Sequence, residues 1–210
     1  MKRMDDLIAR YPALAGQKEA IEQATQLFID VFRSEGKLLI CGNGGSCADG
    51  EHMAGELMKG FMKERSLPKE LQERLVKEHG AVGEELCRGL QVGLPVISLN
   101  THSALHSAFA NDKDDTHIYA QMTLSLGKPG DVLLGISTSG NSKNVLCAVA
   151  LAKTMGLHTV ALTGEGGGKL LNLAEHTICA PHREAYLVQE YHLPIYHAIC
   201  LEIEDAFFSE

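Results

Sequence analysis

Two short turns hold the densest collection of reactive groups in the chain. The first, GNGGS at 42–46, follows an apolar run at 38–41 and includes Asn43, Gly44 and Ser46. Glycine lets a backbone approach a ligand closely, and a helix starting near Ser46 points free N–H groups at an anion, usually phosphate. His52 and Glu56 follow four residues apart, so they share one face of that helix. The stretch predicts an anion site with a proton-transfer or metal site behind it; the alternative is a tight turn with a surface His and Glu.

The second turn, STSGNS at 137–142, directly follows an apolar run at 132–136. Hydroxyl groups donate hydrogen bonds to phosphate oxygens, and the start of the next helix adds its amides. The turn predicts a phosphate site, although a capped ST-rich turn would have the same composition. The chain has neither GxxxxGK[ST] nor GxGxxG, so we expect no nucleotide cofactor. The four hydroxyl residues of this turn are Ser137, Thr138, Ser139 and Ser142.

Apolar runs alternate with helical stripes along the chain, which predicts an α/β fold. We expect a three-layer sandwich in which helices flank a five-stranded, parallel, flavodoxin-like sheet. In such sheets ligands bind beyond the carboxyl ends of the strands, where both turns lie. The expected strands are 38–41, 95–99, 132–136, 159–162 and 177–180. The expected helices include 17–34, 46–62, 103–110 with Ser103 as N-cap, 116–126, 143–155 and 184–208.

The stretch 66–93 differs from the rest because it is heavily charged, with leucines and valines at helical spacing. It predicts a helical insertion of one or two helices, broken at Gly80 and Gly83, that acts as a solvated cap. We expect one domain over residues 1–210, with N-terminal helices within 1–36.

Composition narrows the function classes. The net charge of −8 argues against nucleic acid as a direct ligand. No apolar run approaches the roughly 20 residues of a membrane span, and no signal peptide opens the chain. Six cysteines without a CxxC pair indicate reduced thiols. We therefore expect a cytoplasmic protein that does not bind membranes.

Several separated motifs resemble the sugar isomerase (SIS) family and, within it, the phosphoheptose isomerases. They are GNGGS at 42–46, SALHSAFAND at 103–112, GDVLLGISTSGNS at 130–142 and Q-x-x-H-x-x-x-x-H at 189–197. The resemblance implies a cytoplasmic homotetramer whose neighbouring subunits complete each active site. It implies conversion of sedoheptulose 7-phosphate to D-glycero-D-manno-heptose 7-phosphate through an enediol, an early step toward the heptose of lipopolysaccharide. Apolar faces on 17–34 and 184–208 also favour an oligomer.

The resemblance also assigns roles to residues. It implies that Glu56 and His197 are the catalytic acid/base pair. Isomerisation needs a base at carbon and an acid at oxygen, which a carboxylate and an imidazole supply; a core histidine is the alternative for His197. Some family members bind zinc, here through His52, Glu56, Gln189 and His197. The implied substrate-binding residues are Asn43, Gly44, Ser46, Asp112, Ser137, Thr138, Ser139, Ser142 and Gln189.

Two positions depart from the family pattern. Tyr186 stands where many phosphoheptose isomerases have an acidic residue, and Gly60, beside Lys59, stands where they have an arginine. The exact sugar is therefore less constrained than the phosphate site. The alternatives are a non-catalytic SIS protein, such as a scaffold that binds the replication initiator or a phosphosugar sensor, and an etherase-type lyase. The presence of all four of His52, Glu56, Gln189 and His197 favours the isomerase.

Overall fold

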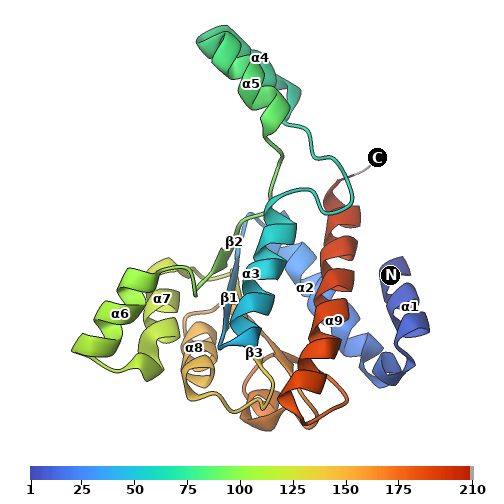
Figure 1. The fold of residues 1–210 in the computed structure, drawn as a ribbon, viewed down its shortest axis with the longest axis vertical. Coiled ribbons are helices and arrows are strands. Elements are labelled where there is room, and N and C mark those ends of the chain that lie inside the picture. The colour runs from blue at the N-terminus through green and yellow to red at the C-terminus, as the bar shows by residue number, and fades with distance from the viewer. Residues whose placement is uncertain (209–210) are drawn as a thin grey trace.

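The computed structural model describes residues 1–208, which form a parallel sheet covered by helices on both faces (Figure 1). The strand order is β2-β1-β3-β4-β5 and every neighbouring pair is parallel. This order confirms the expected flavodoxin-like sheet, because the chain reverses its direction of strand addition between β1 and β3. The strands are β1 (Leu38–Gly42), β2 (Val96–Ser98), β3 (Val132–Ser137), β4 (His158–Thr163) and β5 (His176–Cys179).

Two hydrophobic clusters, one on each face of the sheet, hold the helices in place. Successive residues of β1 alternate between them: Leu38 and Ile40 join the cluster of α2, α3 and α9, while Leu39 and Cys41 join that of α7 and α8. Both faces of the sheet are therefore shielded from water, as a parallel sheet requires. The first face carries α1 (Lys2–Arg10), α2 (Lys18–Arg33), α3 (Gly45–Met58) and α9 (Ala185–Phe207). The second carries α7 (Ile118–Leu126) and α8 (Lys143–Thr154), with α6 (Ser103–Asp112) beside α7; short 3-10 turns are η1 (Pro12–Gln17), η2 (Asp115–His117) and η3 (Gly168–Asn172).

The insertion is a hairpin of two helices, α4 (Lys69–His79) and α5 (Ala81–Gly89), that projects from the body (Figure 1). Gly80 breaks the two helices with a φ of +54°, a value that L side chains rarely adopt. Gly83 is not a break: it lies inside α5, where its missing side chain lets the backbone approach Leu75 of α4. α4 has no buried residue among those described, so the hairpin adds little to the core.

Two expectations were wrong in detail. α3 ends at Met58 rather than near 62, because the following segment turns toward α9. His102 rather than Ser103 is the N-cap of α6. Phe28 of α2 and Ile195 and Ile199 of α9 pack into the core of the same chain, so these residues do not contribute to a partner surface. No helix within residues 1–208 is both long and apolar enough to cross a membrane.

The hairpin buries little against the body, and this yields a prediction. Replacing residues 69–89 by a short Gly/Ser linker should shift the melting temperature by only a few degrees, because these helices bury almost nothing against the body. Arg65, Leu67 and Leu94 stay in the variant, since they are buried. Thermal unfolding followed by circular dichroism measures the effect. Loss of the cooperative transition would mean that the hairpin supports the core.

Candidate functional site

The two predicted turns meet at the carboxyl ends of β1 and β3. Gly42 pairs with Ile136 in the sheet, so the chain leaves both strands at the same edge. Asn43 and Asn144 then join the turns through two reciprocal amide hydrogen bonds, each 2.9 Å long. The geometry confirms that the turns lie together, as their position after neighbouring strands predicted. Asn144, which sequence reasoning missed, lies only two residues beyond the hydroxyl-rich turn.

A buried tyrosine supports the glycine turn from below. The Tyr119 hydroxyl donates to the Gly42 carbonyl over 2.6 Å and accepts a 2.7 Å hydrogen bond from the Asn100 amide. Burial raises the pKa of Tyr119 to about 12, so its hydroxyl stays a donor. Asn100 also donates to the Gly42 carbonyl over 2.9 Å. The turn is therefore held in shape before any ligand arrives. No sequence pattern marked Tyr119, which comes from α7.

The hydroxyl-rich turn is ordered by hydrogen bonds of its own. The hydroxyls of Ser137 and Ser142 lie 2.9 Å apart, and the Ser139 hydroxyl accepts from the Asn141 backbone over 3.2 Å. Neither N-cap residue, Gly44 of α3 or Ser142 of α8, caps its helix with a side chain. Within residues 1–208 the Ser46 N–H of α3 donates to the Asn43 carbonyl and the Val145 N–H of α8 to Asn144 Oδ1, so these N–H groups are already paired. A cavity of about 270 Å³ opens there, and Lys143 adds a positive charge to it. It is lined by Asn43, Asp115, Thr116, Ser142, Lys143 and Asn144.

The predicted reactive residues form a second cluster farther along α3. His52 Nε2 lies 3.2 Å from Glu56 Oε1, and Lys59 Nζ lies 2.7 Å from Glu56 Oε2. Because a carboxylate only accepts hydrogen bonds, His52 donates from Nε2, and its Nδ1 accepts from the Tyr196 hydroxyl over 2.9 Å. The His197 ring stands edge-on to His52, with ring centroids 5.0 Å apart. The fold thus brings His52, Glu56 and His197 together from α3 and α9.

Glu56 and His197 have shifted pKa values that suit proton transfer. Burial would raise the pKa of Glu56, but Lys59 and His52 together hold it below its usual range. Burial lowers the pKa of His197, and the neighbouring charges of His52 and Arg10 lower it further against the opposing effect of Glu56. Near pH 7 the pair is therefore a carboxylate and a neutral imidazole.

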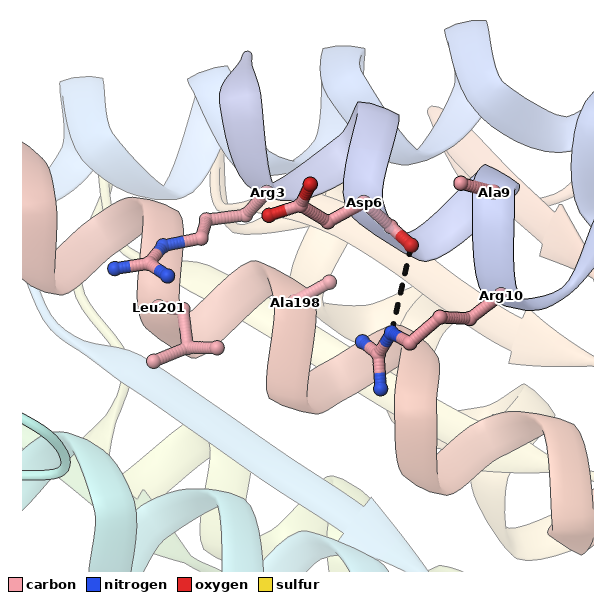
Figure 2. Close-up of a pocket in the computed structure, with 6 residues that line it drawn as sticks. All are labelled: Arg3, Asp6, Ala9, Arg10, Ala198 and Leu201. Atoms are coloured by element: carbon pink, nitrogen blue, oxygen red, sulfur yellow. Dashed lines mark hydrogen bonds between the residues drawn. The ribbon is translucent and has the colours of Figure 1, made fainter.

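His197 faces a small cavity of about 160 Å³ between α1 and α9. Its lining includes Arg10, Phe61 and Leu193, and the Phe61 ring lies 5.3 Å from the His197 ring. His197 Nε2 is buried and has no hydrogen-bond partner among the described residues. A groove of about 400 Å³ continues along α1 from Arg10 toward Arg3 (Figure 2). The His197 ring therefore borders open space, while its Nε2 itself is buried.

The residues fit a metal ion only in part. His52 and Glu56 offer nitrogen and oxygen donors 3.2 Å apart, and these are donor types that zinc accepts. Gln189, however, packs against Gly45 at the start of α3, roughly two helical turns along α9 from His197. In the part of the chain that the structure describes, no three His, Cys, Asp or Glu side chains converge on one point. The four predicted ligands are thus not gathered in this arrangement.

Asp112 is the predicted site residue that the structure leaves apart. It ends α6 on the surface and accepts a 2.9 Å hydrogen bond from its neighbour Asn111. Because Asp112 is exposed, its contact with the sugar stays a prediction. Thr138 and Ser139, in contrast, lie in the turn beside Ser137 as expected.

Comparison with known proteins agrees with this fold. The SIS domain family model matches residues 4–81 and 86–164, and the chain belongs to this family. The Vibrio vulnificus NanR protein complexed with ManNAc-6P is similar at 18% identity and a TM-score of 0.59, covering 98% of this chain and 61% of that one, which shows the fold alone.

Relatives of higher identity share one name. Phosphoheptose isomerases from Roseiflexus sp. and Helicobacter pylori are 34% and 37% identical, covering 92% and 93% of this chain and 85% and 88% of theirs. The solved phosphoheptose isomerase of Neisseria gonorrhoeae superposes with a TM-score of 0.75 at 32% identity, over 96% of this chain and 94% of that one. The predicted family and fold are therefore confirmed.

The lowered pKa of His197 predicts a pH dependence of stability. Between its folded pKa and about 6.5, its ordinary value, the unfolded chain binds a proton that the folded chain refuses, so stability falls as pH falls through this window. Glu56, His52 and Arg10 are the charged or titratable groups that face it. Urea unfolding at pH 7.5 and 5.5 should show a larger loss for wild type than for His197→Gln. Equal losses would contradict the shift.

Proposed function

We propose that this chain is an aldose–ketose isomerase for a phosphorylated sugar, and specifically a phosphoheptose isomerase acting on sedoheptulose 7-phosphate. The observation that carries the proposal is the cluster of Glu56 and His197 on the two helices that also border the glycine turn. Relatives named phosphoheptose isomerase, similar over nearly the whole chain, support the choice of sugar.

In this proposal the phosphate is held by the edge where both turns meet. The hydroxyls of Ser46, Ser137 and Ser142 and the positive N-terminal ends of α3 and α8 suit a phosphate dianion. Lys143 adds charge from the adjacent cavity. Fixing the phosphate orients the carbon chain, which converts proton transfer into a step between positioned groups.

The proton moves between neighbouring carbons. The Glu56 carboxylate takes a proton from C1 of the ketose, and the neutral His197 imidazole donates to the carbonyl oxygen at C2, giving an enediol. Glu56 then returns its proton to C2 while the C1 hydroxyl gives its proton to His197, leaving the aldose. Each residue ends as it began, so no electron acceptor is needed. Lys59 and His52 keep Glu56 ionised for the first transfer.

The zinc ion implied by the family resemblance stays a prediction. His52 and Glu56, with His197 beside them, are the residues that would hold a divalent ion, which when bound would polarise the sugar carbonyl. Elemental analysis, with turnover before and after chelation, measures whether an ion takes part. Full turnover in protein shown to be metal-free would leave the acid/base pair acting unaided.

We also propose that a second copy of the chain covers this cluster and completes the site. Large apolar side chains are exposed near it: Met58 at 56%, Met62 at 74% and Leu193 at 40%. Covering them would exclude water from the reacting carbons. The resemblance implies a tetramer, and light scattering at micromolar concentration measures the assembly. A monomer would reject a shared site.

The competing function is a non-catalytic binder of phosphosugars on the same fold. Such a protein needs the phosphate turns but not the reactive cluster, so the two functions differ in turnover. NMR of the purified protein with sedoheptulose 7-phosphate, with fructose 6-phosphate and arabinose 5-phosphate as comparisons, tests this directly. New aldose signals from the seven-carbon substrate support the isomerase; binding without conversion of any sugar supports the alternative.

Removing the proposed base should abolish most of the turnover. Positioned proton transfer contributes about 10²–10⁴-fold, so Glu56→Gln should lower kcat by that factor while phosphate binding persists. The control is Glu51→Gln, an exposed carboxylate on the same helix, which changes charge equally and should leave kcat unchanged. Wild-type turnover in Glu56→Gln would remove Glu56 from the mechanism.

Removing hydroxyls from the second turn should weaken binding instead. Hydrogen bonds to charged groups contribute about 1.5–3 kcal/mol each, so Ser137→Ala with Ser139→Ala should raise KM by about 10-fold or more. Ser125→Ala on the exposed end of α7 is the matched control. Unchanged binding of the sugar phosphate in the double variant would place the phosphate elsewhere.

A further inference from the structure

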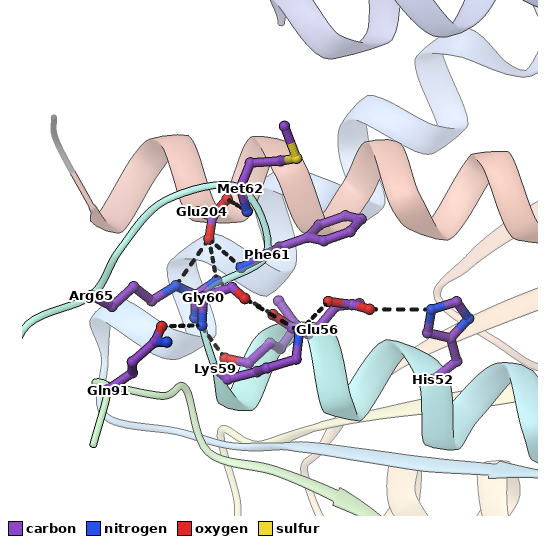
Figure 3. A network of polar contacts seen from close by, with 10 residues as sticks. His52, Glu56, Lys59, Gly60, Phe61, Met62, Arg65, Gln91 and Glu204 are labelled. Atoms are coloured by element: carbon purple, nitrogen blue, oxygen red, sulfur yellow. Dashed lines mark hydrogen bonds and ion pairs between the residues drawn. The ribbon is translucent and has the colours of Figure 1, made fainter. Parts of the chain in front are cut away.

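A buried ion pair between Arg65 and Glu204 lies next to the reactive cluster without belonging to it (Figure 3). The two residues are 2% and 1% exposed. One oxygen of Glu204 accepts from Arg65 Nε at 3.0 Å and Nη2 at 2.8 Å. The carboxylate also accepts from the backbone N–H groups of Phe61 and Met62, both over 2.8 Å. The pair therefore ties the segment after α3 to the last turns of α9.

The guanidinium of Arg65 also reaches the end of α3. Its Nη1 donates to the carbonyl of Leu57 over 2.8 Å, and its Nη2 approaches the carbonyl of Glu56 at 3.4 Å. The last carbonyls of a helix lack intrahelical partners and need donors from elsewhere. Lys59, the C-cap residue, is extended, so a side chain from a later part of the chain fixes the final turn of α3. That turn carries Glu56.

The carboxylate of Glu204 reaches the second reactive residue through Phe61. The Phe61 backbone is bound by Glu204, and the Phe61 ring packs on the ring of His197. Glu204 itself follows His197 on α9 by seven residues, about 10 Å of helix. A single ion pair thus contacts the backbone of Glu56 and, through one aromatic ring, the imidazole of His197.

We propose that Arg65 and Glu204 are positioning residues that set the placement of Glu56 relative to His197; this inference rests on the proposed isomerase function. A buried ion pair is a costly way to stabilise a fold, because an apolar pair of similar volume often does as well. An apolar pair cannot donate to the carbonyls of Glu56 and Leu57 or accept from Phe61. The directional contacts are therefore what the pair contributes.

The first test separates catalysis from binding. Glu204→Gln keeps the shape but removes the charge, and a small misplacement of reacting groups can cost about 100-fold in rate. We expect kcat to fall about 10- to 100-fold with KM within about two-fold of wild type. Asp205→Asn is the matched control, since the next residue on α9 makes only partly exposed ion pairs with Arg3 and Lys63. Wild-type kcat in Glu204→Gln would overturn the proposal.

The second test separates positioning from stability. Glu204→Gln leaves Arg65 as an unpaired buried charge, which destabilises a protein, whereas Arg65→Met with Glu204→Gln removes both charges. The double variant should regain a melting temperature near wild type, while kcat stays low because replacing Arg65 removes the donor to the α3 carbonyls. If kcat recovers together with the melting temperature, the pair is only structural and the proposal fails.

A third readout does not depend on the substrate. In Glu204→Gln the side-chain NMR signals of His197 should shift, because the Phe61 ring moves; in Asp205→Asn they should not. Unchanged His197 signals in a folded Glu204→Gln protein would overturn the proposal even if the sugar is wrong. Absence of turnover in wild type with shifted His197 signals would instead count against the proposed function alone.

Discussion

The parallel pairing of β1 with β3 is the constraint on which the rest of the site depends. It sends the chain out of two neighbouring strands at the same edge, so that a glycine turn and a hydroxyl turn must face each other. The reciprocal bonds between Asn43 and Asn144 then fix their separation. Each turn alone is a common feature of α/β proteins. The strand order brings the two turns together, and this juxtaposition is what makes the proposed phosphate site more specific than either turn alone.

The same order decides which helices can carry chemistry. α3 leaves the glycine turn and runs beside α9, with Gly45 packed under Gln189 at one end and Leu57 near Glu204 through Arg65 at the other. The reactive groups of Glu56 and His197 lie between these two contacts. Their pKa values follow from that position: burial lowers the pKa of His197, and Lys59 with His52 lowers the pKa of Glu56 against the opposing effect of burial. Reactivity here is a property of how two helices are held together, not of any one motif.

Sequence predicted the strands and most helices because their signals are local. The apolar runs of β1 and β3 and the glycine and hydroxyl turns after them are read within a few residues of each other. The residues that hold the turns and helices in place could not be predicted from local sequence. Tyr119 contacts Gly42 across 77 positions, and Arg65 contacts Glu204 across 139, so these contacts exist only once the sheet has formed. Asn144 lay within reach of a local argument, since it lies two residues after the hydroxyl turn.

The error in predicting the end of α3 also has a physical explanation. Gly60 weakens a helix through residues 59–62 without excluding it. Glu204 and Gln91 then accept the backbone N–H groups of Gly60, Phe61 and Met62, which leaves them without helical bonds. A tertiary contact therefore overrides a local preference.

The self-contained hairpin of α4 and α5 has a consequence for how this protein can diversify. Its residues pack mainly on each other, and the segments at its base, around Arg65 and Leu94, belong to the body. Packing in the core places almost no restriction on what amino acids the hairpin carries. Apart from Gly80 and Gly83, its sequence is therefore free to change, or to be selected for contacts outside the chain, while the residues of the reactive cluster stay unchanged. Related enzymes can therefore differ most in this hairpin, on which their folding depends least.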